Sequence, residues 1–78
     1  MKEIEYEHSG RTFKVRSWTE EARFVVAGFE DGSQITLAYG CDVGTAHDLW
    51  LTLKESAASA LHDAVRADIR ARLEAGLL

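Results

Sequence analysis

Residues 2–16 read KEIEYEHSGRTFKVR, and apolar and charged side chains alternate on both sides of Ser9 and Gly10. Alternation with a period of two is typical of a β-strand that buries one face, and Ser-Gly favours a tight two-residue turn. Such a turn places apolar residues opposite each other on one face and opposite charges on the other, in the pairs Ile4–Val15, Tyr6–Phe13, Glu3–Arg16 and Glu5–Lys14. Because one register satisfies both faces, we predict an antiparallel hairpin here.

Asp31 and Gly32 predict a second hairpin, because both residues tolerate the positive φ that tight turns require. A two-residue turn here gives the pairs Phe29–Gln34, Gly28–Ile35, Val26–Leu37 and Phe24–Tyr39. The link over residues 19–22 is expected to place Trp18 opposite Arg23 and Val15 opposite Val26. These registers converge on one buried face, made of Ile4, Tyr6, Phe13, Val15, Phe24, Val26, Ile35, Leu37 and Tyr39.

After Gly40 the chain becomes rich in alanine, leucine and arginine, which favours a helix. Thr45 followed by Asp48 resembles a capping box, and Gly76 favours a left-handed end near the other terminus. Apolar residues recur at every fourth position, at Leu49, Leu53, Ala57, Leu61, Val65, Ile69 and Leu73. This stripe predicts a helix that covers the apolar face of the sheet.

The length of this segment raises a geometric problem. A helix of about thirty residues spans ~45 Å, whereas a seven-residue strand spans only ~23 Å. Either the helix breaks near Glu55, with Ser56 capping a second helix, or its C-terminal half overhangs and packs on another chain. We favour the overhang within a symmetric homodimer, because two-fold dimers are the commonest oligomers. The dimer helix would then use Leu61, Val65, Ile69 and Leu73.

The sequence therefore predicts one α+β domain over residues 1–78, with a sheet half over 1–40 and a helical half over 42–76. The sheet is expected to be a four-stranded antiparallel meander in the order 1-2-3-4. A long C-terminal helix, continuous or broken, is expected to cover one of its faces.

Composition narrows the classes of function. A net charge of −4 argues against a broad electrostatic surface for phosphate backbones. No apolar run approaches the ~20 residues of a membrane span, and the N-terminus does not resemble a secretory leader. The single cysteine, Cys41, excludes a disulfide framework. We expect a cytoplasmic protein with no membrane partner.

Candidate chemical sites all have simpler explanations. Cys41, His47 and Asp48 are residue types of a thiol-based catalytic site. His47 and Asp48 are neighbours on a predicted helix, however, so their side chains diverge by about 100° and Asp48 is not placed to orient His47. The three histidines, His8, His47 and His62, lack the spacing of zinc ligands. The segment 40–45 lacks the lysine of a phosphate-binding loop. We expect no catalytic residue, metal or cofactor, and hence no enzyme.

The face of the sheet away from the helix is the most informative surface. Its apolar and aromatic side chains predict an interaction surface made of Trp18, Arg23, Val25, Ala27 and Phe29. An alternative is single-stranded nucleic acid, gripped by basic and aromatic side chains together: Lys14, Arg16, Trp18, Arg23 and Phe29. The acidic residues of the first strand are expected to pair with Lys14 and Arg16, which disfavours that alternative.

Two short segments, residues 50–55 with Trp50 and Leu53, and residues 63–66, resemble the terminal helix of the positive-cofactor-four transcriptional coactivators. The resemblance implies a four-stranded meander followed by one long helix, dimerisation, and single-stranded DNA binding across the sheet. The family's basic, glycine-containing loop before the last strand is replaced here by residues 30–33, Glu-Asp-Gly-Ser. No functional residue carries over.

We therefore expect a small non-enzymatic interaction or regulatory domain that self-associates through its C-terminal helix. Excess apolar surface on the sheet and on the helix is the basis for this expectation. Single-stranded nucleic-acid binding by the outer face of the sheet is the alternative.

Overall fold

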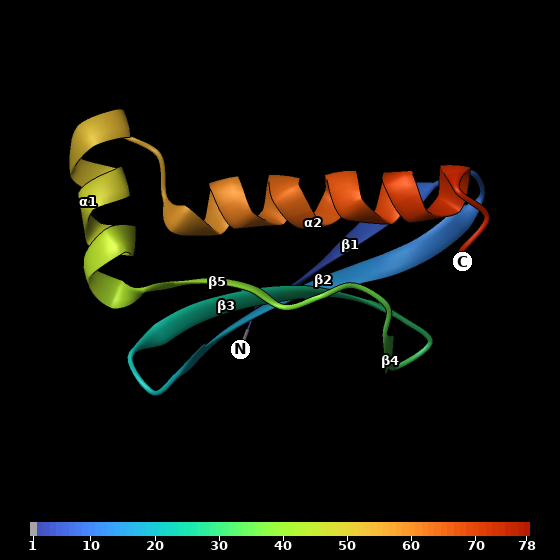
Figure 1. The fold of residues 1–78 in the computed structure, drawn as a ribbon, viewed down its shortest axis with the longest axis horizontal. Coiled ribbons are helices and arrows are strands. Elements are labelled where there is room, and N and C mark those ends of the chain that lie inside the picture. The colour runs from blue at the N-terminus through green and yellow to red at the C-terminus, as the bar shows by residue number, and fades with distance from the viewer. Residues whose placement is uncertain (1) are drawn as a thin grey trace.

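The computed structural model describes residues 2–78, which form an antiparallel sheet and two helices (Figure 1). The elements, in chain order, are β1 (Lys2–His8), β2 (Arg11–Glu20), β3 (Arg23–Glu30), β4 (Ser33–Gln34), β5 (Tyr39–Asp42), α1 (Val43–Leu53) and α2 (Ala57–Glu74). The strand order is β1-β2-β3-β4, and β5 also pairs with β3. Helix α2 lies along one face of the sheet, and α1 stands across one end of it. The predicted α+β meander is confirmed, with a fifth strand added.

The first hairpin has the predicted register. Ile4 pairs with Val15, Tyr6 with Phe13, and the charged partners follow on the other face. Ser9 and Gly10 both have positive φ, at 54° and 74°, as a tight hairpin turn requires.

The second turn lies one residue further along the chain than predicted. Glu21 and Ala22, with φ of 48° and 63°, form the turn, so that Trp18 pairs with Val25 and Val15 pairs with Gly28. The predicted pairs of Trp18 with Arg23 and Val15 with Val26 are therefore wrong by two residues. This register places Glu20 directly opposite Arg23, a favourable pair of opposite charges. Because the shift is even, each side chain keeps its predicted face.

The third hairpin departs from the prediction beyond its turn. Phe29 pairs with Gln34 as expected, but the chain then leaves the ladder and rejoins it as β5, where Val26 pairs with Tyr39. The predicted partner of Val26, Leu37, is instead 68% exposed. Two additional residues over 35–38 therefore form a bulge, which splits the expected fourth strand into β4 and β5.

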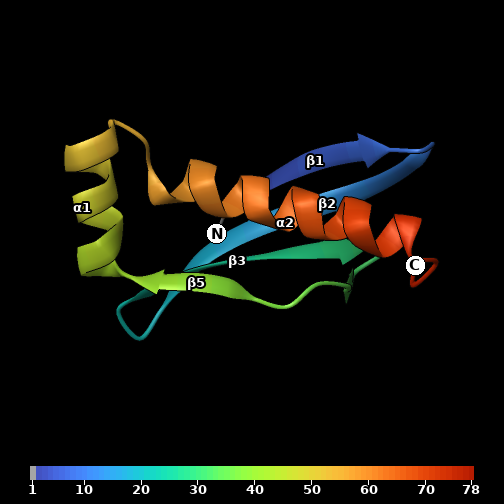
Figure 2. The same ribbon diagram turned by 45° about the horizontal axis from the view of Figure 1, so that its top comes forward.

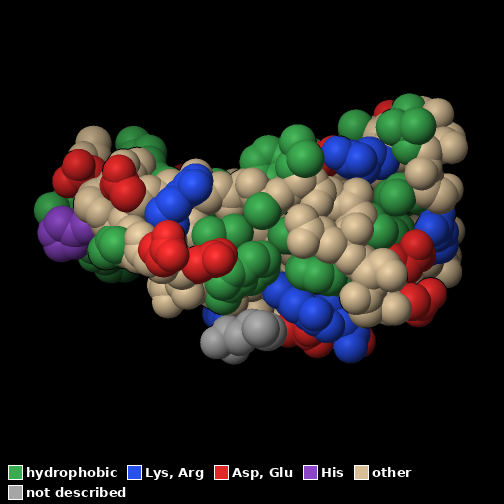
Figure 3. All heavy atoms as spheres, turned by 60° about the horizontal axis from the view of Figure 1, so that its bottom comes forward, with side chains coloured by type: hydrophobic (Ala, Val, Ile, Leu, Met, Phe, Trp, Pro, Cys, Tyr) green, Lys and Arg blue, Asp and Glu red, His purple; other side chains and the backbone are tan. Residues whose placement is uncertain are grey.

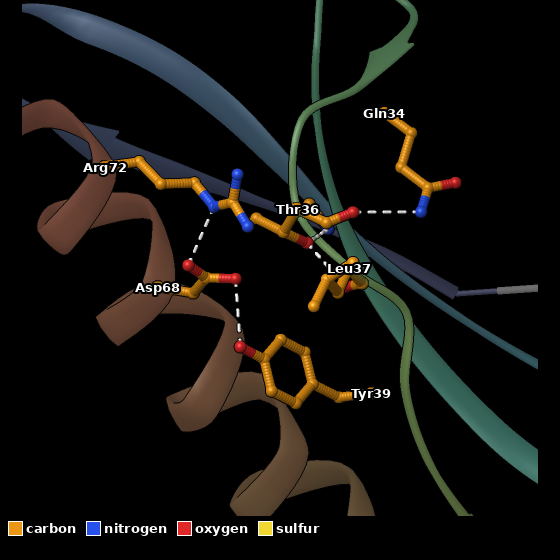
Figure 4. A network of polar contacts seen from close by, with 7 residues as sticks. Gln34, Thr36, Leu37, Tyr39, Asp68 and Arg72 are labelled. Carbon is orange, nitrogen blue, oxygen red and sulfur yellow. Dashed lines mark hydrogen bonds and ion pairs between the residues drawn. The ribbon is translucent and has the colours of Figure 1, made fainter. Parts of the chain in front are cut away.

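Thr36 holds this bulge together, as Figure 4 shows. Its buried hydroxyl accepts a hydrogen bond from the Gly28 N–H at 2.9 Å and donates one to the Leu37 carbonyl at 2.9 Å. The side-chain amide of Gln34 donates to the Thr36 carbonyl at 2.9 Å. The hydroxyl thus replaces the ladder contact that β3 loses where the bulge begins.

Gly28 allows α2 and the bulge to lie close to β3. A Cβ atom at this position would lie 3.0 Å from Thr36 Cγ2, 3.1 Å from Ile69 Cδ1 and 3.2 Å from Val65 Cγ1. Val65 and Ile69 complete a core whose five fully buried members also include Phe13, Val15 and Val26. The core therefore forms where α2 crosses β2 and β3.

Asp68 connects α2 to β5 at the rim of this core. One carboxylate oxygen accepts a hydrogen bond from the Tyr39 hydroxyl at 2.9 Å, and the other accepts one from Arg72 Nε at 2.8 Å (Figure 4). The hydrogen bond to Asp68, aided by burial, raises the pKa of Tyr39 above its usual 10.0.

The helical half is broken, so the continuous overhanging helix is wrong and the alternative with a break at Ser56 is confirmed. Lys54 ends α1 with a left-handed φ of 56°, and the Ser56 hydroxyl accepts the Ser59 N–H at 3.2 Å to begin α2. The 18 residues of α2 span ~27 Å, which matches the ~26 Å of the eight residues of β3. The single helix implied by the coactivator resemblance is absent from residues 2–78 for the same reason.

The N-terminal end of α1 is capped by a side chain, and the C-terminal end of α2 is capped by a glycine. Asp42, not the predicted Thr45, begins α1, because its carboxylate accepts the Thr45 N–H at 2.7 Å. At the other end, Gly76 has φ of 74°, as expected. The Leu77 N–H bonds to the Arg72 carbonyl and the Gly76 N–H bonds to the Leu73 carbonyl, which is the Schellman arrangement.

Replacement of Gly28 by alanine tests the close approach of α2 to the sheet. The added methyl group must displace Thr36, Val65 or Ile69, so we expect Gly28→Ala to lower the free energy of unfolding by about 1–3 kcal/mol in urea denaturation.

Gly44→Ala is the matched control for this experiment. A Cβ at Gly44 would lie 3.5 Å from Asp42 Oδ1 and meet nothing closer, and alanine favours a helix by up to about 1 kcal/mol. Equal unfolding free energies for Gly28→Ala and the unmodified protein would contradict the packing described above.

Candidate functional site

The expected interaction surface on the sheet is only partly open. Within this set, Val25 and Ala27 are buried, Trp18 and Phe29 are half-buried, and Arg23 is exposed. The two apolar residues at the centre of the predicted surface, Val25 and Ala27, are therefore not available for contact.

The basic residues of the same face are engaged with acidic ones. Glu3 pairs with Arg16 and, at 3.3 Å, with Lys14. The hydrogen bond from Arg16 is the main cause that lowers the pKa of Glu3 below its usual 4.5. The guanidinium of Arg16 also lies over the ring of Phe29, 4.5 Å from its centre. Figure 3 shows basic, acidic and apolar side chains interleaved on this side of the molecule.

This arrangement bears on the nucleic-acid alternative. Of its five residues, Lys14 and Arg16 share one carboxylate, and the guanidinium of Arg16 stacks on the ring of Phe29. A phosphate backbone would have to compete with Glu3 for both cations, and a base would have to displace Arg16 from Phe29.

The expected dimer helix packs on its own sheet. Val65 and Ile69 are fully buried in the core of the single chain, and Leu61 and Leu73 are partly buried against that core. Val65 and Ile69 are therefore not free for contact with a second chain, and the stripe over residues 61–73 is the core side of α2.

Helix α1 carries the exposed apolar surface that the sequence analysis missed. None of its residues is buried, and four large apolar side chains on it are half or more exposed: Val43, Trp50, Leu51 and Leu53. Trp50 is 55% exposed and Leu53 59%. We call this projecting, apolar helix the α1 arm. Figure 1 shows it standing at one end of the sheet, beyond the first turn of α2.

A hollow lies beside the α1 arm where it meets β3 and the start of α2. Its volume is about 330 Å³, and it is lined by Phe24, Val43, Ala46, His47, Trp50, Ser56, Ala57 and Ala58. A second, shallower hollow of about 250 Å³ follows the other side of the arm, along Thr45, Asp48, Leu49, Thr52 and Leu53. The arm is thus an apolar ridge with an apolar hollow beside it.

Of the residues considered for catalysis, His47 and Asp48 line the hollows beside the α1 arm, whereas Cys41 lines neither. Cys41 is a half-buried free thiol in β5, paired with Phe24, whereas His47 is exposed on α1. Residues 2–78 contain no group of three histidine, cysteine, aspartate or glutamate side chains that could hold a metal ion. Neither helix in the same range is long and apolar enough to cross a membrane.

His62 has an unusual environment for a titratable side chain. It is 3% exposed on the core side of α2, and neither ring nitrogen has a hydrogen-bond partner among residues 2–78. Burial lowers the pKa of His62 below its usual 6.5, and the charges of Arg66 and Lys2 lower it further, while Asp63 opposes them.

This lowered pKa predicts a pH-dependent stability. The unfolded chain protonates His62 near pH 6.5 and the folded chain only at lower pH, so the unfolded state binds more protons in between. We expect the free energy of unfolding to fall as the pH drops below about 6.5 in urea denaturation. Glu3 and Asp42, whose pKa values are also lowered, lose their contribution only below their usual 4.5 and 3.8.

His62→Leu is the control for this prediction. The variant removes the titrating ring from the core and should flatten the dependence between about pH 7.5 and about pH 5.5. The same slope in both proteins would assign the effect to another group.

Comparison with known proteins adds no relative: no protein family, curated protein or solved structure matches the chain.

Proposed function

We propose that this protein is a small, non-enzymatic interaction domain that self-associates through the α1 arm. The observation that carries the proposal is the exposure of Val43, Trp50, Leu51 and Leu53 on one short helix that contributes no buried residue to the fold. Exposed apolar side chains gathered on one element are typical of a protein interface.

A second copy of the chain is the occupant that we propose for this surface. The arm presents a ridge, with Trp50 and Leu53, next to a hollow that includes Phe24 and Ala57. Under a two-fold axis the same patch meets itself, so the arm of each chain packs against the arm of the other. This arrangement buries both features at once in a dimer.

The charge distribution also favours a second copy of the chain as the partner of the α1 arm. The chain carries a net charge of −4, so two copies repel each other over most orientations. Helix α1, residues 43–53, contains a single acidic residue, Asp48, and no lysine or arginine. The arm is therefore the segment where two copies approach with little electrostatic cost.

The size of the molecule is compatible with an interface of this kind. A standard interface takes about 800 Å² from each partner, which is about a sixth of the 4948 Å² surface of the chain. The eleven residues of α1 project from one end of a body with extents of 37 × 24 × 18 Å. A contact that covers the arm and the adjoining hollow would bury an area of the same order as this standard interface.

The experiment compares oligomeric state across charge-introducing variants. We expect the unmodified protein to sediment as a dimer and Leu53→Glu to weaken dimerisation by at least about thirtyfold, because a buried charge replaces a central apolar contact. Leu37→Glu is the matched control, since Leu37 is 68% exposed against 59% for Leu53 but lies on the bulge, and this variant should leave the dimer intact.

Trp50 supplies a second measurement. In a Trp18→Phe background it is the only tryptophan, and its fluorescence should shift to shorter wavelength as concentration rises and the dimer forms. A protein that stays monomeric over a hundredfold concentration range would contradict self-association. In that case, salt-sensitive binding of a labelled single-stranded oligonucleotide would favour the nucleic-acid alternative.

A further inference from the structure

A pocket of about 340 Å³ lies between the beginning of β1 and the first two turns of α2. Its lining comes from both elements, namely Lys2 and Ile4 of β1 together with Ser56, Ala58, Ser59, His62, Asp63 and Arg66 at and after the start of α2. Figure 2 shows β1 running beside α2 in this part of the fold. The pocket is separate from the hollow beside the α1 arm, although both include Ser56 and Ala58.

Two cations converge on the pocket from different elements. Lys2 reaches it from the sheet and Arg66 from the helix, and both lower the pKa of His62 through their charge. The single acidic group, Asp63, accepts a hydrogen bond from Arg66 Nη1 at 3.0 Å. Lys2 and Arg66 outnumber this carboxylate, so the side chains that line the pocket carry a net positive charge.

The first turn of α2 contributes backbone donors. Ser56 caps the helix through the Ser59 N–H, and the Ala60 N–H makes the first backbone bond, to the Ser56 carbonyl at 3.3 Å. The N–H group of Ala58, which lines the pocket, precedes that bond and lies at the positive end of an 18-residue helix. Such an end favours an anion with oxygen acceptors.

His62 is the independent observation that indicates a ligand. Only 3% of the residue is exposed, and it lines the pocket with both ring nitrogens buried and unpaired within residues 2–78. An unpaired polar group in a protein interior is costly, and an apolar side chain of similar size would avoid that cost. A histidine here is explained if one ring N–H donates to a group that enters the pocket.

We propose that this pocket binds a phosphate group, with Lys2 and Arg66 supplying charge and the start of α2 and His62 supplying N–H donors. Phosphate fits better than carboxylate, because donors approach from the strand, the helix end and the buried ring, and its oxygens point in more directions. The volume of about 340 Å³ exceeds what orthophosphate fills, which favours a small phosphate monoester. This inference does not rest on self-association.

The first test follows backbone amides and the His62 ring by NMR while inorganic phosphate is added at constant ionic strength. We expect saturable shifts at Ala57, Ala58 and Ser59 and a rise in the pKa of His62, because the anion favours the protonated ring. Shifts that sodium chloride reproduces at equal ionic strength, or that do not saturate, would overturn the proposal.

Charge-removing variants locate the site. Lys2→Gln and Arg66→Gln should each weaken phosphate binding by about tenfold, because each removes a charge-assisted hydrogen bond. Arg70→Gln is the matched control: it lies one turn further along α2, outside the pocket lining, and should change the affinity by less than about twofold. Equal weakening in all three variants would indicate general electrostatic attraction and contradict a site.

His62→Leu separates a binding role from a purely structural one. If His62 serves the ligand, the variant should melt at a higher temperature than the unmodified protein and bind phosphate more weakly. Unchanged phosphate affinity would remove His62 from the site and overturn the proposal.

A comparison of inorganic phosphate with glycerol phosphate, at equal ionic strength, then identifies the source of the group. Tighter binding of the ester indicates an organic ligand, and equal binding indicates free phosphate.

Discussion

Gly28 of β3 has no side chain, so Val65 and Ile69 of α2 pack directly against its backbone. A Cβ atom at this position would lie too close to both side chains. The same backbone donates its N–H to Thr36, which holds the bulge that returns the chain to the edge of β3. The core, the bulge and the path of β5 therefore meet at one residue. Because β5 leads directly into α1, this close contact also determines where the α1 arm leaves the sheet.

The sequence predicts correctly which face of the sheet Phe24, Val26 and Tyr39 occupy. It predicts the register of the first hairpin but misplaces the registers of β2 with β3 and of β3 with β5 by two residues. Alternation identifies which side chains share a face, and an even shift preserves that assignment, so Phe24, Val26 and Tyr39 point inward although each has a different partner from the one predicted. Leu37 was misplaced because the bulge depends on a tertiary contact, the Thr36 hydroxyl with Gly28. Nothing in the local pattern of residues 33–39 distinguishes that contact from a regular strand.

The apolar stripe of the helical half likewise predicts the wrong interaction surface, because it does not distinguish the exposed residues of α1 from the buried residues of α2. Leucine and alanine at every fourth position continue across Glu55 and Ser56, so periodicity alone indicates one helix with one buried face. The sheet is long enough for only one of the two helices. Helix α2 covers it with Val65 and Ile69, and α1 therefore buries none of its residues. The Ser56 cap and the mismatch in length were both visible in the sequence. The exposure of Trp50 and Leu53 follows from them only once α1 turns away from the sheet.

The break at residues 54–56 brings two candidate sites to the same helical turn. Ser56 and Ala58 line the pocket beneath Lys2 and Arg66 and also the hollow beside Trp50. If the proposed phosphate and the proposed second chain both bind, both contact Ser56 and Ala58, so that one can change the affinity of the other. Such coupling is reciprocal, so whatever free energy an anion contributes to dimerisation, the dimer contributes equally to anion binding. The first turn of α2 lines both sites and is therefore the part of this fold through which they can act on each other.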